Sequence, residues 1–151
     1  MKYCIDTSSF IESWHRRYPQ DIFPSFWHKL SDIIDTQIVV AQEVVIKEIE
    51  SQDDTLHEWV KQREKLRVPF DEKIQQIASG ILQDYPRIVG SHQKFGADPF
   101  VIALAKQRDL TVITEEQGGT DKKPKIPFIC RHINVRCVSM LEFIREMKWS
   151  F

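Results

Sequence analysis

Asp6 is the first residue of this sequence whose position predicts a chemical role. It ends the apolar run "YCID", and a carboxylate at the end of a buried strand is costly unless it is hydrogen-bonded, paired or bound to a cation. Glu48, Asp98 and Glu116 also stand beside apolar runs. Because these are oxygen ligands without a cluster of histidine or cysteine, they favour a hard cation, Mg²⁺ or Mn²⁺. Such an ion would relieve the repulsion among the carboxylates and lower the pKa of a bound water.

Short apolar runs predict the strands that would position these acids. They cover residues 3–6, 37–41, 110–114 and 135–139. Runs that are apolar on both faces are typical of a buried parallel sheet, and the helical patterns between them predict an α/β fold with right-handed crossovers. The carboxyl ends of parallel strands meet at one edge of the sheet, where ligands bind. We therefore expect the four acids at one end of the molecule.

The connecting helices are predicted from their periodicity and their end signals. Residues 97–110, "ADPFVIALAKQRDL", form the clearest helix, with Asp98 at the N-cap position and Pro99 at the first helical position. The segment from about 53 to 86 is predicted to be helical throughout, with one break at "VPF". A chain of 151 residues is expected to form a single domain, here residues 1–151.

Each acid also has a purely structural interpretation. Asp98 before a proline is a good helix cap, and Glu48 is compatible with the solvated side of a helix. Glu115 and Glu116 both follow the run at 110–114, so either of them can be the acid that faces the other three.

Composition limits the function further. With 21 basic and 22 acidic residues and a net charge of −1, the chain needs a local patch to bind a polyanion. Cys4, Cys130 and Cys137 include no C-x-x-C pair, which predicts a reducing, cytoplasmic setting. The spacing of Cys130, His132 and Cys137 matches no usual zinc site. No export signal and no long apolar run are present, so we expect a soluble cytoplasmic protein without a membrane segment.

The acidic segments also carry a family resemblance. In order, "YCIDTSSFI", "VVIKEIE", "GADPFVIALA" and "TVITEE" resemble the four acidic motifs of the PIN-domain superfamily of metal-dependent nucleases. The tail "KIPFICRHINVRCVSMLEFIREM" and the early "FPSFWHKL" further resemble an uncharacterised subgroup of bacterial and archaeal PIN proteins related to the VapC toxins. This resemblance implies a Rossmann-like three-layer α/β/α sandwich with a mostly parallel central sheet, and Mg²⁺- or Mn²⁺-dependent hydrolysis of RNA.

The resemblance implies roles for individual acids. Asp6 and Asp98 would be the principal metal ligands. Glu48 would hold a metal directly or through water, and Glu116 would complete the cluster. The family more often has aspartate as its last acid, so the pair Glu115–Glu116 is a departure. We favour Glu116, because the family pattern places the acid two residues after a threonine.

The resemblance also assigns supporting residues. Thr7 and Ser8 would order the loop of the first ligand, and Thr114 would hydrogen-bond ligands or water. A second departure is Pro99, which fixes the start of the helix and would commit part of the Asp98 carboxylate to capping.

Basic residues on loops at the same edge are candidates for contacts to the substrate. The candidates are His92 and Lys94 before Asp98, and Lys122, Lys123 and Lys125 after Glu116. The segment "HRR" at residues 15–17 is a further candidate. Taken one at a time, such residues are more often ordinary solvated charges.

Two hypotheses follow for the function. The first is a Mg²⁺- or Mn²⁺-dependent endoribonuclease that acts as the toxin of a type II toxin–antitoxin pair, with RNA as substrate, a cognate antitoxin as partner and a homodimer as its form. The second is a non-catalytic PIN-like scaffold that binds protein or RNA. A phosphatase of the aspartyl-phosphate class is disfavoured, because Ser8 stands where that class requires a second aspartate.

Overall fold

The computed structural model describes residues 1–89 and 96–151, and within them a parallel five-stranded sheet forms the centre of the molecule. Its strands are β1 (Tyr3–Ile5), β2 (Val39–Gln42), β3 (Arg67–Val68), β4 (Thr111–Ile113) and β5 (Cys137–Val138), in the spatial order β3-β2-β1-β4-β5. Strand β1 lies in the middle, where Tyr3 pairs with Val39 on one side and Thr111 on the other. The chain reverses its direction of winding beside β1, which is where α/β sheets bind ligands.

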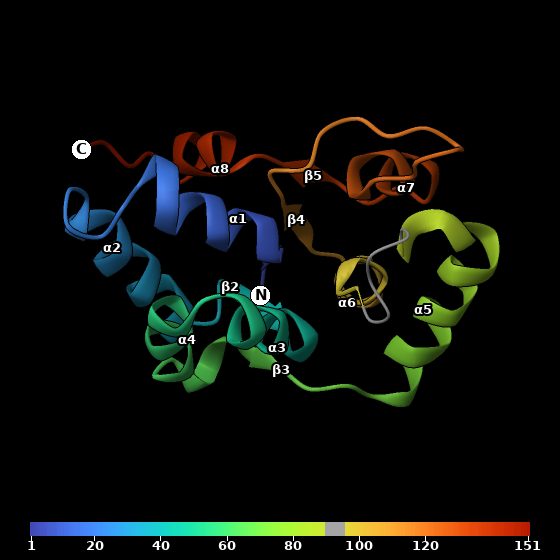
Figure 1. Ribbon diagram of the computed structural model, residues 1–151, viewed down its shortest axis with the longest axis horizontal. Helices are drawn as coiled ribbons and strands as arrows, with labels where there is room; N and C mark the ends of the chain where they lie inside the picture. Colours follow the sequence, from blue (N-terminus) through green and yellow to red (C-terminus); the bar gives the residue numbers. More distant parts are fainter. Residues whose placement is uncertain (90–95) are drawn as a thin grey trace.

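Helices cover both faces of this sheet (Figure 1). They are α1 (Thr7–Glu12), α2 (Pro24–Asp35), α3 (Glu43–Gln52), α4 (Asp54–Lys61), α5 (Glu72–Asp84), α6 (Asp98–Arg108), α7 (Ile126–His132) and α8 (Met140–Glu146). A π-helical turn, η1 (Ser13–Arg17), continues α1, and the 3₁₀ turns η2 (Glu64–Leu66) and η3 (Pro86–Val89) precede β3 and follow α5. The result is a three-layer α/β/α sandwich.

Neighbouring residues of β1 show which helices lie on which face. The Cys4 thiol contacts the Val101 carbonyl of α6 at 3.8 Å, whereas the Tyr3 ring packs edge-on against Phe143 of α8. Because successive side chains of a strand point to opposite faces, α6 and α8 cover opposite faces. Figure 1 shows α5 and α7 on the side of α6, and α1 and α2 on the other side.

Three tryptophans, one of them on α2, contribute to the core. Trp27 is fully buried, donates its indole N–H to the Tyr18 carbonyl, and packs edge-on against Trp14 and Trp59 with ring centroids 4.9 Å apart in both cases. Buried aromatic pairs of this geometry add to the free energy of burial. These rings stabilise the fold and do not form an open surface for stacking bases.

The strands expected at residues 3–6, 37–41, 110–114 and 135–139 occur as β1, β2, β4 and β5. The expectation that the segment from about 53 to 86 is helical apart from a break at "VPF", with no strand, is wrong, because Arg67–Val68, at the start of that break, forms β3. Strand β3 is held by Glu43 of α3, whose carboxylate accepts hydrogen bonds from the Arg67 guanidinium at 2.6 Å and the Phe70 amide at 3.1 Å. A two-residue strand has no alternating pattern to read. Among the described helices, none has the length and apolar character needed to cross a membrane.

Candidate metal centre

Asp6 lies at the carboxyl end of the central strand and is 1% exposed. Its amide donates to the Ile113 carbonyl at 2.9 Å, which continues the pairing of β1 with β4 beyond the last strand residue. Its Oδ2 accepts two hydrogen bonds, from Ser8 Oγ at 2.7 Å and from Thr114 Oγ1 at 3.0 Å. Among the described residues no donor is assigned to Oδ1, so this oxygen is available to a cation.

The same two hydroxyls also fix the backbone that carries the next acids. Ser8 Oγ accepts the amide N–H of Glu115, and Thr114 Oγ1 accepts that of Glu116, each at 3.1 Å. The loop after β1 and the loop after β4 are therefore held together by two small side chains. Thr7 is also buried, but its hydroxyl has no hydrogen-bond partner among the described residues.

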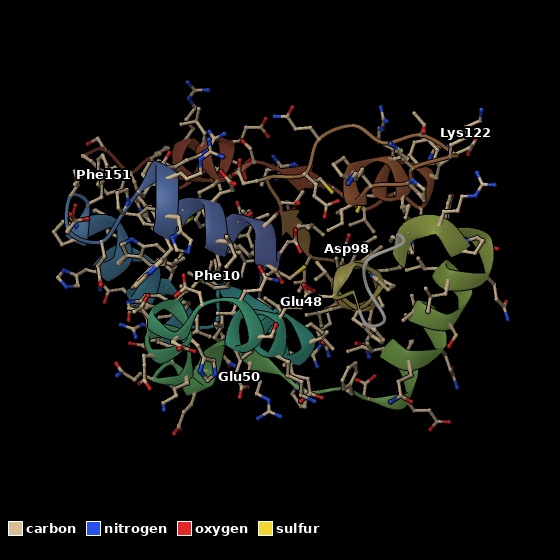
Figure 2. All side chains as sticks on the ribbon, viewed as in Figure 1. Phe10, Glu48, Glu50, Asp98, Lys122 and Phe151 are labelled. Carbon is tan, nitrogen blue, oxygen red and sulfur yellow. The ribbon has the colours of Figure 1, made fainter. Side chains whose placement is uncertain are left out.

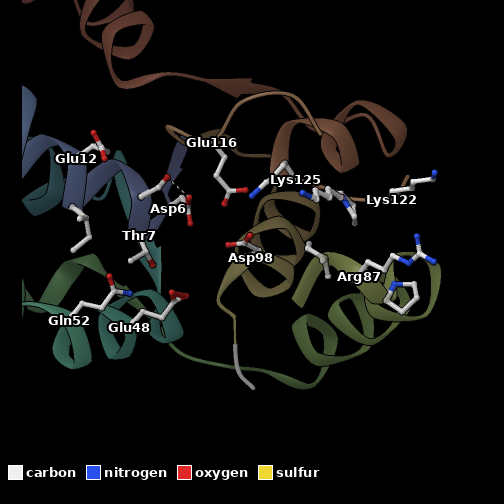
Figure 3. Close-up of a pocket in the computed structure, with 16 residues that line it drawn as sticks. Asp6, Thr7, Glu12, Glu48, Gln52, Arg87, Asp98, Glu116, Lys122 and Lys125 are labelled. Carbon is white, nitrogen blue, oxygen red and sulfur yellow. Dashed lines mark hydrogen bonds between the residues drawn. The ribbon is translucent and has the colours of Figure 1, made fainter. Parts of the chain in front are cut away.

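Three carboxylates meet at this point. Asp6, Asp98 and Glu116 each offer one oxygen, and these oxygens lie within 4.8 Å of one another. They line a cavity of about 900 Å³ together with Glu48 (Figure 3). Among the described residues this is the only group of three or more His, Cys, Asp and Glu side chains that is close enough to share an ion, so Cys130 forms no such site.

Asp98 enters the cluster from the start of α6, where it is the first helical residue. The expectation that Asp98 caps this helix with Pro99 in the first helical position is wrong by one residue, because Ala97 is the N-cap and no side-chain capping bond is made. The carboxylate is therefore not committed to capping. It lies near the positive end of the helix dipole, which favours an anion.

Glu48 faces the cluster from α3 and supports Asp98 through the backbone. Its Oε1 accepts the Ala97 amide N–H at 2.7 Å, one residue before Asp98. Figure 2 places Glu48 beside Asp98, while Glu50, on the same helix, lies at the outer surface. Glu48 is outside the group of three but lines the same cavity.

The two consecutive glutamates after β4 point to different partners. Glu115 Oε1 accepts the Met140 amide at the start of α8 at 2.8 Å, and its Oε2 lies 4.0 Å from the Arg17 guanidinium. Glu116 turns into the cluster, and its Oε1 accepts the Ile126 amide of α7 at 3.4 Å. The structure thus brings Glu116, and not Glu115, to Asp6 and Asp98.

Burial and mutual repulsion make this cluster hold protons when no cation is present. Burial, together with the Glu116 charge, raises the pKa of Asp6 to about 7. Burial and the charges of Asp6 and Glu116 raise the pKa of Asp98 to about 10, and burial also raises that of Glu48. A divalent cation removes this repulsion, and the all-oxygen donor set fits Mg²⁺ or Mn²⁺.

Basic side chains also line the cavity. Lys122, Lys123 and Lys125 lie there, as does Arg87 of η3, which the sequence did not single out. The only signal for Arg87 is its place in "YPRIV", directly after a predicted helix. The other two predicted contacts, His92 and Lys94, lie outside the described residues.

The basic segment of η1 does not line the cavity. His15 pairs with Asp53, Arg16 lies 3.8 Å from Glu12, and Arg17 contacts Glu115 as described above. These side chains are therefore engaged with carboxylates of the protein itself.

Residues 3–151 match the model of a family described as "Domain of unknown function (DUF4411)". No curated protein matches the sequence.

Solved structures share the fold over nearly the whole chain. The crystal structure of VapBC2 from Rickettsia felis bound to a DNA fragment from their promoter has a TM-score of 0.59 at 11% identity, covering 92% of this chain and 98% of that one. The structure of FitAB bound to an IR36 DNA fragment has a TM-score of 0.55 at 20% identity, covering 91% and 94%. The crystal structure of FitAcB from Neisseria gonorrhoeae has a TM-score of 0.50 at 21% identity, covering 89% of this chain and 95% of that one. The PIN-like α/β/α fold expected from the acidic motifs is confirmed.

Proposed function

We propose that this chain, which belongs to the family described as "Domain of unknown function (DUF4411)", is a nuclease that hydrolyses RNA phosphodiester bonds with Mg²⁺ or Mn²⁺. The observation that carries the proposal is the meeting of Asp6, Asp98 and Glu116 at the carboxyl edge of the sheet, with oxygens within 4.8 Å. Acids gathered this closely and this deeply oppose folding unless a cation or protons neutralise them.

The residues divide the work as follows. Asp6 Oδ1, Asp98 and Glu116 would hold the ion, while Ser8 and Thr114 donate hydrogen bonds to the second oxygen of Asp6. The ion, when bound, would lower the pKa of a water molecule and neutralise charge on the phosphodiester.

Glu48 is positioned to orient the attacking water. One of its oxygens accepts a hydrogen bond from the Ala97 amide. Among the described residues, no donor contacts the other oxygen. Burial raises the pKa of Glu48, which makes its carboxylate a stronger proton acceptor. No protein nucleophile is required for this reaction.

The biological role we propose is that of the toxin of a type II toxin–antitoxin pair in the cytoplasm, with a cognate antitoxin as partner and a homodimer as the working form. The resemblance to VapC toxins supports this role, as does the fold shared with VapBC2 and FitAB. Lys122 and Lys123, which line the cavity, are the proposed substrate contacts.

The purified chain tests this proposal in two measurements. We expect Mn²⁺ to raise the melting temperature, because an ion that binds only the native state stabilises it by about 2.7 kcal/mol at 100 times its Kd. We also expect metal-dependent cleavage of RNA. Asp6→Asn should abolish both with the fold retained by circular dichroism, and Asp32→Asn, at an exposed position of α2, is the matched control. Cleavage by Asp6→Asn at the wild-type rate would show that the site is wrong.

The alternative is a non-catalytic PIN-like scaffold that binds protein or RNA. Pro99 and the pair Glu115–Glu116, the two departures from the family pattern, favour it, yet Asp98 makes no capping bond and Glu116 reaches the cluster. Absence of both cleavage and a metal-dependent rise at millimolar Mn²⁺ would favour the scaffold.

A further inference from the structure

We propose, on the basis of the nuclease function above, that the cavity binds a nucleic-acid strand on only one side of the acidic cluster. The cations that line the cavity are Arg87, Lys122, Lys123 and Lys125. They come from two neighbouring segments, the turn η3 and the loop that leads into α7. We refer to these four residues as the basic rim.

The opposite wall of the cavity has a different character. It is formed by α1 and α3, and among the described residues of these helices that line the cavity none is a cation. Figure 3 shows Glu12 and Gln52 on that side, and Arg87 and Lys122 across the cavity from them. Among the described residues that line the cavity, the positive charge is therefore confined to one wall.

Cations close to the opposite wall lie near carboxylates of the protein itself. Arg16 lies 3.8 Å from Glu12, and Arg17 lies 4.0 Å from Glu115. Within the part of the chain that the structure describes, no member of the basic rim is in an ion pair, and all four are exposed. Of the residues that the structure describes, only those of the rim offer unpaired positive charge to a ligand in the cavity.

The backbone of the rim is fixed before any ligand binds. Gly119 has φ +109°, and a Cβ at this position would lie 2.7 Å from the Lys125 amide nitrogen, so the loop folds closely against the start of α7. Thr120 and Lys123 exchange two hydrogen bonds of 3.1 Å, which close a turn around Lys122. Pro124, which is buried, restricts the backbone between Lys123 and Lys125.

A nucleic-acid strand carries one negative charge per nucleotide, and its affinity comes largely from contacts between phosphates and cations. With the scissile phosphate at the acidic cluster, the phosphates on one side of it meet the basic rim. Phosphates on the other side meet the wall formed by α1 and α3, where no described cation lines the cavity. The strand is thus held by its nucleotides on one side of the cut, and little affinity comes from the other side.

Binding of a fluorescein-labelled single-stranded RNA oligonucleotide in EDTA tests the rim without any cleavage. Fluorescence anisotropy at several salt concentrations gives the slope of log affinity against log salt. This slope is about 0.7 for each phosphate contact of a single strand, so R87Q/K122Q/K123Q should lower it by about 2. The matched control R16Q/K47Q/K61Q removes the same charge from exposed positions in η1, α3 and α4 that do not line the cavity, and should leave the slope unchanged. An unchanged slope in the first variant, or an equal loss in both, overturns the proposal.

Cleavage of chimeric strands tests the one-sidedness directly. One oligonucleotide carries neutral methylphosphonate linkages in its 5′ half, and a second carries them in its 3′ half. In one chimera we expect cuts up to the junction between the charged half and the neutral half. In the other we expect the cuts to stop several linkages short of that junction. The variant R87Q/K122Q/K123Q should remove this difference. Equal cut positions in both chimeras overturn the proposal. If no strand is cleaved at all, the nuclease function fails, whereas the anisotropy comparison still decides the role of the rim.

Discussion

The Thr114 hydroxyl donates a hydrogen bond of 3.0 Å to Asp6 Oδ2, which joins the end of β4 to the end of β1. The same hydroxyl accepts the Glu116 amide at 3.1 Å. An uncharged side chain therefore aims one proposed metal ligand and fixes the backbone of another.

Replacing Thr114 by valine should weaken the centre while leaving its acids in place. We expect a 10- to 100-fold loss in metal affinity or cleavage rate, roughly the cost of removing a residue that orients metal ligands. The readouts are the Mn²⁺ dependence of the melting temperature and the rate of RNA cleavage. Thr111→Val, at the other end of β4, is the control, and equal behaviour of the two variants would contradict the orienting role.

Asp98→Asn should make the metal-free protein more stable and abolish its response to Mn²⁺. Burial and the neighbouring acids raise the pKa of Asp98 to about 10, so at neutral pH this carboxyl group must take up a proton on folding, which lowers the stability of the native state. The neutral amide needs no proton, and we expect a gain of about 1–3 kcal/mol in unfolding free energy in EDTA, which corresponds to one or two pKa units. Asp84→Asn, at an exposed position at the end of α5, should neither raise the stability in EDTA nor abolish the response to Mn²⁺. A loss of stability in EDTA would show that the Asp98 carboxylate is not destabilised by its surroundings.

The stability of the metal-free protein should fall as the pH rises from 4 to 8. The folded-state pKa of Asp6 is raised to about 7, above the value of about 3.9 for an unfolded chain. The native state therefore binds more protons, so this contribution to stability is complete below about pH 4 and is lost as the pH passes through about 7. Thermal melts in EDTA across this range measure it. Asp6→Asn should make the profile less steep, and the slope that remains comes from Asp98, whose pKa is raised to about 10. Stability that increases from pH 5 to 8 in EDTA would refute the prediction.

The consecutive glutamates should respond differently to the same substitution. Glu116→Gln should raise the Mn²⁺ concentration needed for the same rise in melting temperature at least 10-fold, because it removes a proposed ligand. Glu115→Gln should leave that rise intact, because Glu115 accepts the Met140 amide and contacts Arg17. Loss of the metal response in Glu115→Gln alone would reverse the assignment.

Gly119→Ala should destabilise the loop that carries the lysines of the basic rim. The added Cβ would lie within 2.9 Å of Lys125 and Phe128 atoms, at a φ of +109°. We expect a loss of about 1–3 kcal/mol in unfolding free energy, as for a strained backbone position. Gly118→Ala, at φ +67° with open space around its Cβ, should cost only about 1 kcal/mol. Urea denaturation measures both losses, and an equal loss in the two variants would contradict a role for close packing at Gly119.

The sequence was sufficient for four of the five strands and for the acids at the edge of the sheet, because buried parallel strands read as continuous apolar runs. The order of the runs then fixes which acids share an edge. Strand β3 was missed because Arg67–Val68 is too short for a pattern and depends on Glu43, 24 positions away. Such a tertiary contact leaves no local signal.

Side-chain direction was the second limit of the sequence. Spacing alone could not separate Glu115 from Glu116, because the choice depends on how α8 approaches the strand end through Met140. Arg87 was missed for a related reason, since only the packing of α5 against α6 brings η3 to the cavity.

Strand β1 is the first strand of the chain and also the central strand of the sheet. The hydrogen bond from Thr114 to Asp6 spans 108 positions, so during synthesis Asp6 leaves the ribosome long before its partner exists. Contacts this distant in sequence are typical of slow folding. A nascent or truncated chain that ends before β4 therefore lacks both Thr114 and Glu116, and the proposed nuclease centre cannot form until most of the protein has been made.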